Sequence, residues 1–340
     1  MTLSKRLNHI DCTRGFAIIC VIIGHVLGKT VEAEGFDTFS IYNVIFKFIY
    51  SFHMPLFFFL SGIFVNSHLK KSFSEGIKKK FLRLMIPYFV WTFIFVLIKQ
   101  LSPSLQSNET SWSVFLKSPI DPNPLQYWFL YVLFVVYVIY SISFWLIKEN
   151  KKTNIIILII SLVLALINPL VENVWISHYL FQNLIFFALG TFYISKIYPM
   201  KNRSVFLTGL LFVFFEALYF LNAYRNTILK SYIVILCGLT GVIFVTKLFS
   251  LFFDRDEKKI QSFFSFNGVH SMEIYCTHPI IAAAIRIVIS KIFVLAHFDC
   301  GISIEMLLTI ALTIVIADSI SFLLKSFKSY GWLFGVYQEG

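Results

Sequence analysis

Long apolar runs alternate with short polar segments along the whole chain. An α-helix of about 20 residues crosses the apolar core of a bilayer, and ten of the runs are that long or nearly so. The runs cover residues 14–30, 41–65, 81–98, 127–147, 155–170, 176–197, 205–224, 232–253, 269–289 and 304–327. Because a helix satisfies its own backbone hydrogen bonds in lipid, the pattern predicts an all-α polytopic integral membrane protein with about ten transmembrane helices.

The composition agrees with a membrane protein. The chain is 58% hydrophobic and only 14% charged, whereas soluble domains carry about 25% charged residues. The net charge of +11 would suit nucleic acid, but the cations gather in short segments between the apolar runs, as topology determinants do. With the N-terminus placed in the cytoplasm, most of the 29 lysine and arginine residues fall on the cytoplasmic side. We therefore expect a bilayer as partner, no nucleic acid, and both termini in the cytoplasm.

The segments between the apolar runs are short. The longest, residues 100–126, is rich in Ser, Pro and Asn and is expected on the outer side of the membrane. None of them is large enough for a folded soluble domain. We expect a single transmembrane domain over residues 1–340, with no appended soluble domain.

The first apolar run begins with a cation and ends near a histidine, in the stretch RGFAIICVIIGH. Arg14 and His25 are eleven residues apart, about 1100° of helical rotation, so both side chains point from one face. The rise of about 16 Å takes His25 roughly to the middle of the bilayer. Ionisable side chains are costly at that depth, which marks His25 as a candidate functional residue.

Other ionisable side chains are expected at a similar depth in the second, seventh and ninth runs: His53, Glu216, Glu273 and His278. They should face the protein interior or a hydrated cavity, and they would suit proton handling or acyl transfer. A structural role is the alternative for each of them. A membrane histidine often only forms a hydrogen bond between helices, and Glu273 could pair with a cation of a loop.

A basic segment, residues 70–83, precedes the third run. Its simplest role is topological, but Lys80 and Arg83 are three residues apart and share a helix face, so they could also bind an anion at the cytoplasmic mouth. The sequence has no metal-ligand spacing, no Walker loop and no glycine-rich dinucleotide turn, and we expect no metal.

Several stretches resemble the acyltransferase-3 family of integral membrane acyltransferases over nearly the whole chain. These stretches are IDCTRGFAIICVIIGH, FHMPLFFFLSG, KKKFLRLMIPYFVW, QYWFLYVLF, FFALGTF and GVHSMEIYCTHPI, in the family's order. The most specific are the Arg–ten residues–His spacing and FHMPLFFFLSG. The sequences FHMPLFF and YWFL are most similar to those of the branch of fucose 4-O-acetylase-like and other polysaccharide O-acetyltransferases.

This resemblance implies an O-acetyltransferase in a bacterial cell membrane, which moves an acetyl group from cytoplasmic acetyl-CoA to a hydroxyl of an extracytoplasmic or lipid-linked sugar. It implies that His25 is catalytic and that Arg14 acts with it toward the coenzyme, with Lys80 and Arg83 as further coenzyme-binding cations. The family often has arginine at both of the last two positions, and lysine offers a point charge instead of a fork.

The chemistry that the resemblance implies suits these residues. His25 could deprotonate the acceptor hydroxyl or attack the thioester, and Asp11 could orient Arg14. His53, Glu216 and His278 are possible relay or acceptor-side groups. Many relatives carry a C-terminal esterase-like domain, so a separate extracytoplasmic transferase is a possible partner.

A transporter or exporter of a glycan or small solute is the alternative function. About ten spans, mid-membrane charges and a proline in a helix would suit it equally well. A transporter should show repeats with paired broken helices, which the sequence does not show. An acyltransferase needs a basic mouth aligned with a reactive histidine, which the first run supplies.

Overall fold

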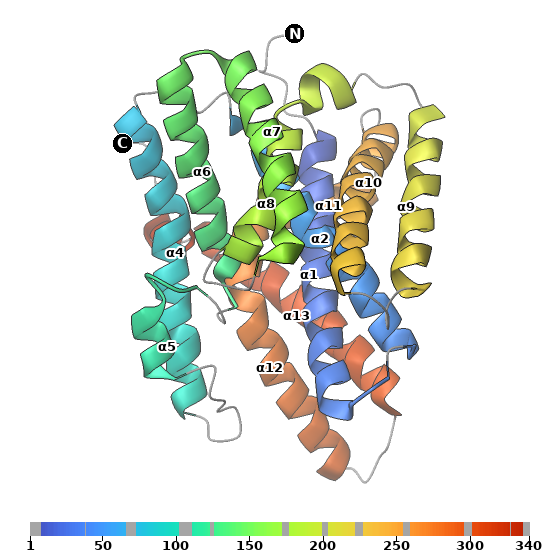
Figure 1. Ribbon diagram of the computed structural model, residues 1–340. Helices are drawn as coiled ribbons and strands as arrows, with labels where there is room; N and C mark the ends of the chain where they lie inside the picture. Colours follow the sequence, from blue (N-terminus) through green and yellow to red (C-terminus); the bar gives the residue numbers. More distant parts are fainter. Residues whose placement is uncertain are drawn as a thin grey trace. The chain divides into compact units, whose positions relative to one another are not determined.

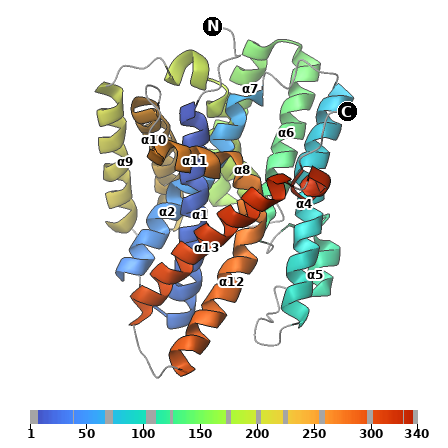
Figure 2. The same cartoon turned by 180° about the vertical axis from the view of Figure 1, so that it is seen from behind.

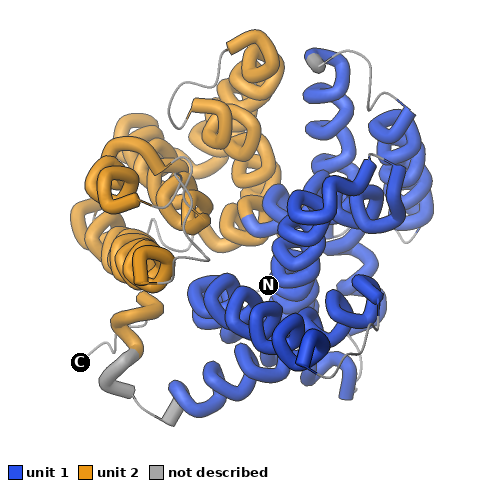
Figure 3. Tube along the Cα trace, turned by 90° about the horizontal axis from the view of Figure 1, so that it is seen from below, with its two compact units in different colours: residues 1–57, 197–326 blue, residues 58–196, 327–340 orange. Residues whose placement is uncertain are grey.

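The computed structural model describes residues 8–37, 39–65, 73–101, 111–122, 126–171, 177–198, 203–221, 227–253, 259–295, 301–326 and 328–335. Within these ranges every regular element is a helix, and nine helices are long and apolar enough to cross a membrane (Figure 1). The predicted all-α polytopic membrane class is confirmed. The chain divides into two compact units, Met1–Phe57 with Ile197–Ser326 and Phe58–Lys196 with Phe327–Gly340 (Figure 3).

The first unit is arranged around helix α1 (Asn8–Glu34). Its other helices are the first part of α2 (Ile41–Ile63), α9 (Arg203–Leu221), α10 (Thr227–Phe253), α11 (Lys259–Val269), α12 (Ser271–Leu295) and α13 (Gly301–Ser326). α1 packs against α10, α11, α12 and α13, and Figure 2 shows the short α11 lying across it. In an 18-residue apolar stretch of α1, 72% of the residues are buried, whereas in the corresponding stretches of α9, α12 and α13 the share is 28% or less. α1 is therefore an interior helix, whereas those three present most of their apolar surface outward.

Two glycines bring α1 and α11 into backbone contact. A Cβ atom at Gly15 would overlap the carbonyl oxygen of Phe264, and one at Gly268 would overlap the carbonyl oxygen of Asp11. Without side chains at these positions the two backbones approach as closely as in small-residue contacts between membrane helices. The crossing lies next to Arg14, so it holds in place the part of α1 that carries this candidate site residue.

The second unit contains the end of α2 and a set of helices and short turns. These are α4 (Phe73–Leu101), α5 (Trp112–Lys117), α6 (Trp128–Ile147), α7 (Asn150–Ile167), η3 (Asn168–Leu170), α8 (Ser177–Gly190), η4 (Tyr193–Ile197) and η5 (Lys328–Phe334). α4 packs against α6 and η5, and α7 packs against α8. A Cβ at Gly62 would overlap the carbonyl of Phe187, beside Gly190. Without side chains at Gly62 and Gly190 the end of α2 and α8 approach each other closely.

The sixth apolar run differs from its prediction. Instead of one span over residues 176–197, α8 ends at Gly190 and a π-helical turn, η4, follows. Thr191 Oγ1 donates to the carbonyl of Ala188 at 2.7 Å, and this local bond accompanies the break. For this reason nine described helices, and not ten, meet the length of a span. The other nine runs each contain a long helix, with ends shifted by up to eight residues.

Two helices were not predicted, α5 within the 100–126 segment and α11 before the ninth run. Both are too short to produce the signal of a span. Residues 70–72 of the basic segment and residues 102–110 and 123–125 of the segment 100–126 lie outside the described residues, as do several loop cations, among them Lys5, Arg6, Lys201 and Arg255.

Candidate active site

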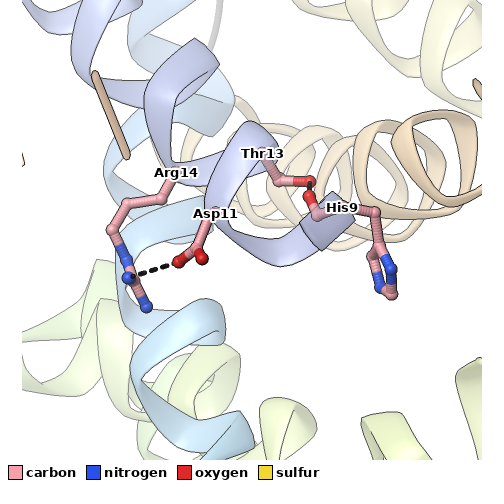
Figure 4. A network of polar contacts seen from close by, with 4 residues as sticks. All are labelled: His9, Asp11, Thr13 and Arg14. Carbon is pink, nitrogen blue, oxygen red and sulfur yellow. Dashed lines mark hydrogen bonds and ion pairs between the residues drawn. The ribbon is translucent and has the colours of Figure 1, made fainter. Parts of the chain in front are cut away.

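Arg14 and Asp11 form an ion pair in the first turns of α1. Nη1 of Arg14 lies 3.4 Å from Oδ1 of Asp11, and their side chains are 28% and 13% exposed. Figure 4 shows the two side chains together on one side of the helix, with the ring of His9 on another. The i, i+3 spacing brings these residues together, and the expected pairing of Asp11 with Arg14 is present. A guanidinium carries its N–H donors in a planar fork, the geometry that suits an anion.

His25 lies on the same continuous helix and forms a ring-to-ring hydrogen bond with His278 of α12. Its Nδ1 is 2.8 Å from Nε2 of His278, and the ring planes are 27° apart. His278 is fully buried, and its Nδ1 lies 2.9 Å from the carbonyl oxygen of Ile274. Two of the predicted site residues, 253 positions apart in sequence, are therefore in direct contact.

His53 of α2 is 1% exposed and belongs to the same neighbourhood. Its Nδ1 donates to the carbonyl oxygen of Ile49 at 2.7 Å, and its ring meets Tyr50 edge to face. It lies close enough to His25 for the two rings to interact electrostatically. The hydrogen bond to the preceding helical turn fixes the orientation of the His53 ring. A ring fixed in this way is compatible with a structural role and with a role in the site.

Glu216 of α9 belongs to a different cluster. Ser51 Oγ contacts both Oε1 of Glu216 and the carbonyl oxygen of Phe48, the latter at 2.8 Å, and the thiol of Cys237 lies beside the same carboxyl group. A hydroxyl has one hydrogen, and a carbonyl only accepts. Both bonds form together when Ser51 donates to Phe48 and Glu216, as a neutral acid, donates to Ser51. A neutral acid also suits the buried position of Glu216.

A third polar cluster was only partly foreseen. Oε1 of Glu273 lies 3.4 Å from Nδ1 of His270, the residue directly before α12. Asn267 of α11 donates to Asp318 of α13 at 3.2 Å. Asp318, a carboxyl group well inside the last apolar run, was missed, although the criterion that selected Glu216 would also have found it. Ser51 and Cys237, the partners of Glu216, were missed because lone small polar residues are common in membrane helices.

Lys80 and Arg83 lie on α4, in the second unit. Nζ of Lys80 is 3.9 Å from the centre of the Tyr137 ring, a cation–π contact, and Tyr137 in turn donates to the carbonyl oxygen of Ser61 at 3.1 Å. The side chain of Arg83 is exposed. Their predicted joint role with Arg14 in coenzyme binding stays a prediction. Among the described residues, no group of three or more His, Cys, Asp or Glu side chains could hold a metal ion.

Comparison with known proteins agrees with a membrane acyltransferase. The model of the acyltransferase domain of the acyltransferase-3 family matches residues 7–325. The chain is also similar to two proteins named nodulation protein NolL. The one from Mesorhizobium japonicum is 28% identical over 148 residues, or 41% of this chain and 38% of the relative. The one from Sinorhizobium fredii is 37% identical over 82 residues, or 24% of this chain and 22% of the relative. No solved structure is significantly similar.

Since the family model covers nearly the whole chain, the protein belongs to the acyltransferase-3 family, and its long apolar helices are those of a multi-pass membrane protein. Family membership favours the enzyme over the transporter alternative. The aligned part spans less than half the length of each curated relative.

Proposed function

We propose that the protein is an O-acetyltransferase of a bacterial cell membrane, with cytoplasmic acetyl-CoA as donor and a hydroxyl of an extracytoplasmic or lipid-linked sugar as acceptor. The observation that carries this proposal is the contact of His25 with His278 between apolar helices. An imidazole in such an environment supplies a base where water is scarce, and acyl transfer to a sugar instead of to water requires this. The two relatives with curated names are also bacterial proteins.

Arg14 serves the coenzyme in this proposal. Acetyl-CoA carries several phosphates, and the guanidinium of Arg14, oriented by Asp11, offers paired donors for one of them. The eleven residues from Arg14 to His25 correspond to about 16 Å of helix, a distance that an extended pantetheine arm can cover. Lys80 and Arg83 supply further positive charge for the phosphates.

The acceptor approaches the histidine pair from the opposite side. His25 takes the proton of the acceptor hydroxyl as general base, and His53 and Glu216 act on the acceptor side or as relays. A separate extracytoplasmic transferase would pass the acetyl group onward if the final glycan is distant from the membrane.

The test uses purified protein in detergent or lipid discs with acetyl-CoA, and it measures thiol release with and without sugar acceptors. Wild type should cleave the thioester, and His25→Ala should lose at least about 10²-fold of that rate, the usual contribution of a general base. Ile22→Ala is the matched control, because it removes a fully buried side chain one turn away on the same helix. It should retain most of the activity.

Arg14→Ala tests the coenzyme role separately. It should weaken acetyl-CoA binding while Arg14→Lys retains part of it, because lysine keeps the charge but not the fork. Full thioester cleavage by His25→Ala would refute the catalytic centre. A wild-type protein that neither binds nor cleaves acetyl-CoA, with or without an acceptor, would refute the donor.

A further inference from the structure

The hydrogen bonds of the histidine pair form a chain that ends on the backbone of α12. Nδ1 of His278 is 2.9 Å from the carbonyl oxygen of Ile274. A carbonyl oxygen only accepts, so Nδ1 of His278 carries the hydrogen. A neutral imidazole has one N–H and one lone pair, which leaves Nε2 of His278 as an acceptor.

That acceptor determines the form of the second ring. Nε2 of His278 is 2.8 Å from Nδ1 of His25, so Nδ1 of His25 is the donor and the lone pair of His25 lies on its Nε2. The ring planes are 27° apart with centroids separated by 4.9 Å, which lets the N–H of one ring point toward the lone pair of the other. Both rings lie in apolar helices, where the neutral forms cost least.

We propose that His278 is a positioning residue that holds His25 in the Nδ1–H tautomer, so that Nε2 of His25 is the nitrogen that acts as base. This inference rests on the proposed acetyl transfer and names the reacting atom within it. His278 performs the orienting task that a carboxylate performs in serine-hydrolase triads, without placing a charge in the membrane interior.

The proton balance of the transfer follows from this arrangement. Nε2 of His25 takes the proton of the acceptor hydroxyl while the acceptor oxygen bonds to the thioester carbonyl carbon. The carbon–sulfur bond then breaks, and the leaving thiolate takes the proton back from Nε2, which gives the ester and the free thiol of the coenzyme. Throughout, Nδ1–H of His25 stays donated to His278, which stabilises the transient imidazolium.

Substitution of His278 tests the role. Glutamine places an amide group where Nε2 now lies and can accept from Nδ1–H of His25, whereas leucine fills the space and cannot. We expect His278→Gln to retain kcat within about tenfold and His278→Leu to lose about 10²-fold in kcat, with the KM for acetyl-CoA nearly unchanged in both. Cys276→Ala, at another fully buried position of α12, is the packing control.

Nitrogen-15 NMR of histidine-labelled wild type gives a readout that a purely structural role would not move. The His25 signals, identified by their loss in His25→Ala, should report hydrogen on Nδ1 in wild type and in His278→Gln, and a changed tautomer ratio in His278→Leu. Hydrogen on Nε2 in wild type, or an unchanged kcat in His278→Leu, would overturn the inference while the proposed function stands. Isolation of a covalently acetylated His25 would overturn the role as base. Full thioester cleavage by His25→Ala would refute the catalytic centre and this inference with it, whereas a wild type that neither binds nor cleaves acetyl-CoA would refute the proposed function itself.

Discussion

Replacement of Gly268 by alanine should separate α11 from α1 and weaken the site that the crossing supports. A Cβ at this position would overlap the carbonyl oxygen and carbon of Asp11. These are backbone atoms of a continuous helix, so they cannot rotate away, and α11 must move outward until ordinary van der Waals separation is restored. Overpacking of this kind costs about 1–3 kcal/mol, and the better helix propensity of alanine offsets up to about 1 kcal/mol of that.

The matched control is Gly76→Ala in α4. A Cβ at Gly76 meets nothing within 4 Å, so this variant receives the gain in helix propensity without the overlap. The difference between the two variants therefore isolates the crossing and should be about 1–3 kcal/mol in favour of Gly76→Ala. Thermal unfolding in one detergent, followed by size-exclusion of the surviving protein, measures this difference as a lower melting temperature for Gly268→Ala.

The same variant should affect the coenzyme. Asp11 pairs with Arg14, so an outward push on the backbone of Asp11 changes the position of the guanidinium. Gly268→Ala should bind acetyl-CoA more weakly than Gly76→Ala does. Equal melting temperatures for the two variants would refute the packing argument, and equal affinities with unequal stabilities would refute only the link to Arg14.

Two further predictions concern polar contacts. Glu216→Gln should keep its stability within about 1 kcal/mol, since the amide group can still form a hydrogen bond with Ser51; thermal unfolding measures this, and the infrared carbonyl band of a protonated carboxyl group should disappear with the substitution. A wild type without that band would contradict the neutral acid. Tyr137→Phe should lose about 1 kcal/mol with the bond to Ser61, and Tyr137→Leu should lose more because Lys80 also loses its aromatic partner. Equal stabilities of these two variants would contradict the cation–π contact.

The sequence was sufficient for the class of fold and for the local part of the site. Runs of apolar residues predict spans because the bilayer imposes one length on each of them. The Arg14–Asp11 pair follows from a spacing of three residues on one helix. The placement of Arg14 and His25 on a single helix follows from an uninterrupted apolar run.

The pairing of residues between helices could not be predicted in the same way. His25, His53 and His278 each appear as a polar position in an apolar run. Which of them are in contact depends on how the helices are rotated and packed. The apolar pattern says little about this, because helix faces toward lipid and toward protein are both apolar. The same reason explains why Glu216 was grouped with the histidines, whereas its hydrogen bond is to Ser51. The sixth run is interrupted directly after Gly190, where α8 approaches Gly62 of α2, and such a contact between helices is likewise a tertiary feature.

The crossing at Gly15 and the histidine pair at His25 lie on one rigid helix, ten residues apart, and both ends are held by other helices. Exchange of one apolar residue for another between them changes only packing. Insertion or deletion of a single residue is different, because it turns His25 by about 100° around the helix axis while the crossing stays in place. A one-residue change of length in this stretch would remove His25 from His278 with every side chain still present. The stretch should therefore tolerate changes of composition and not changes of length.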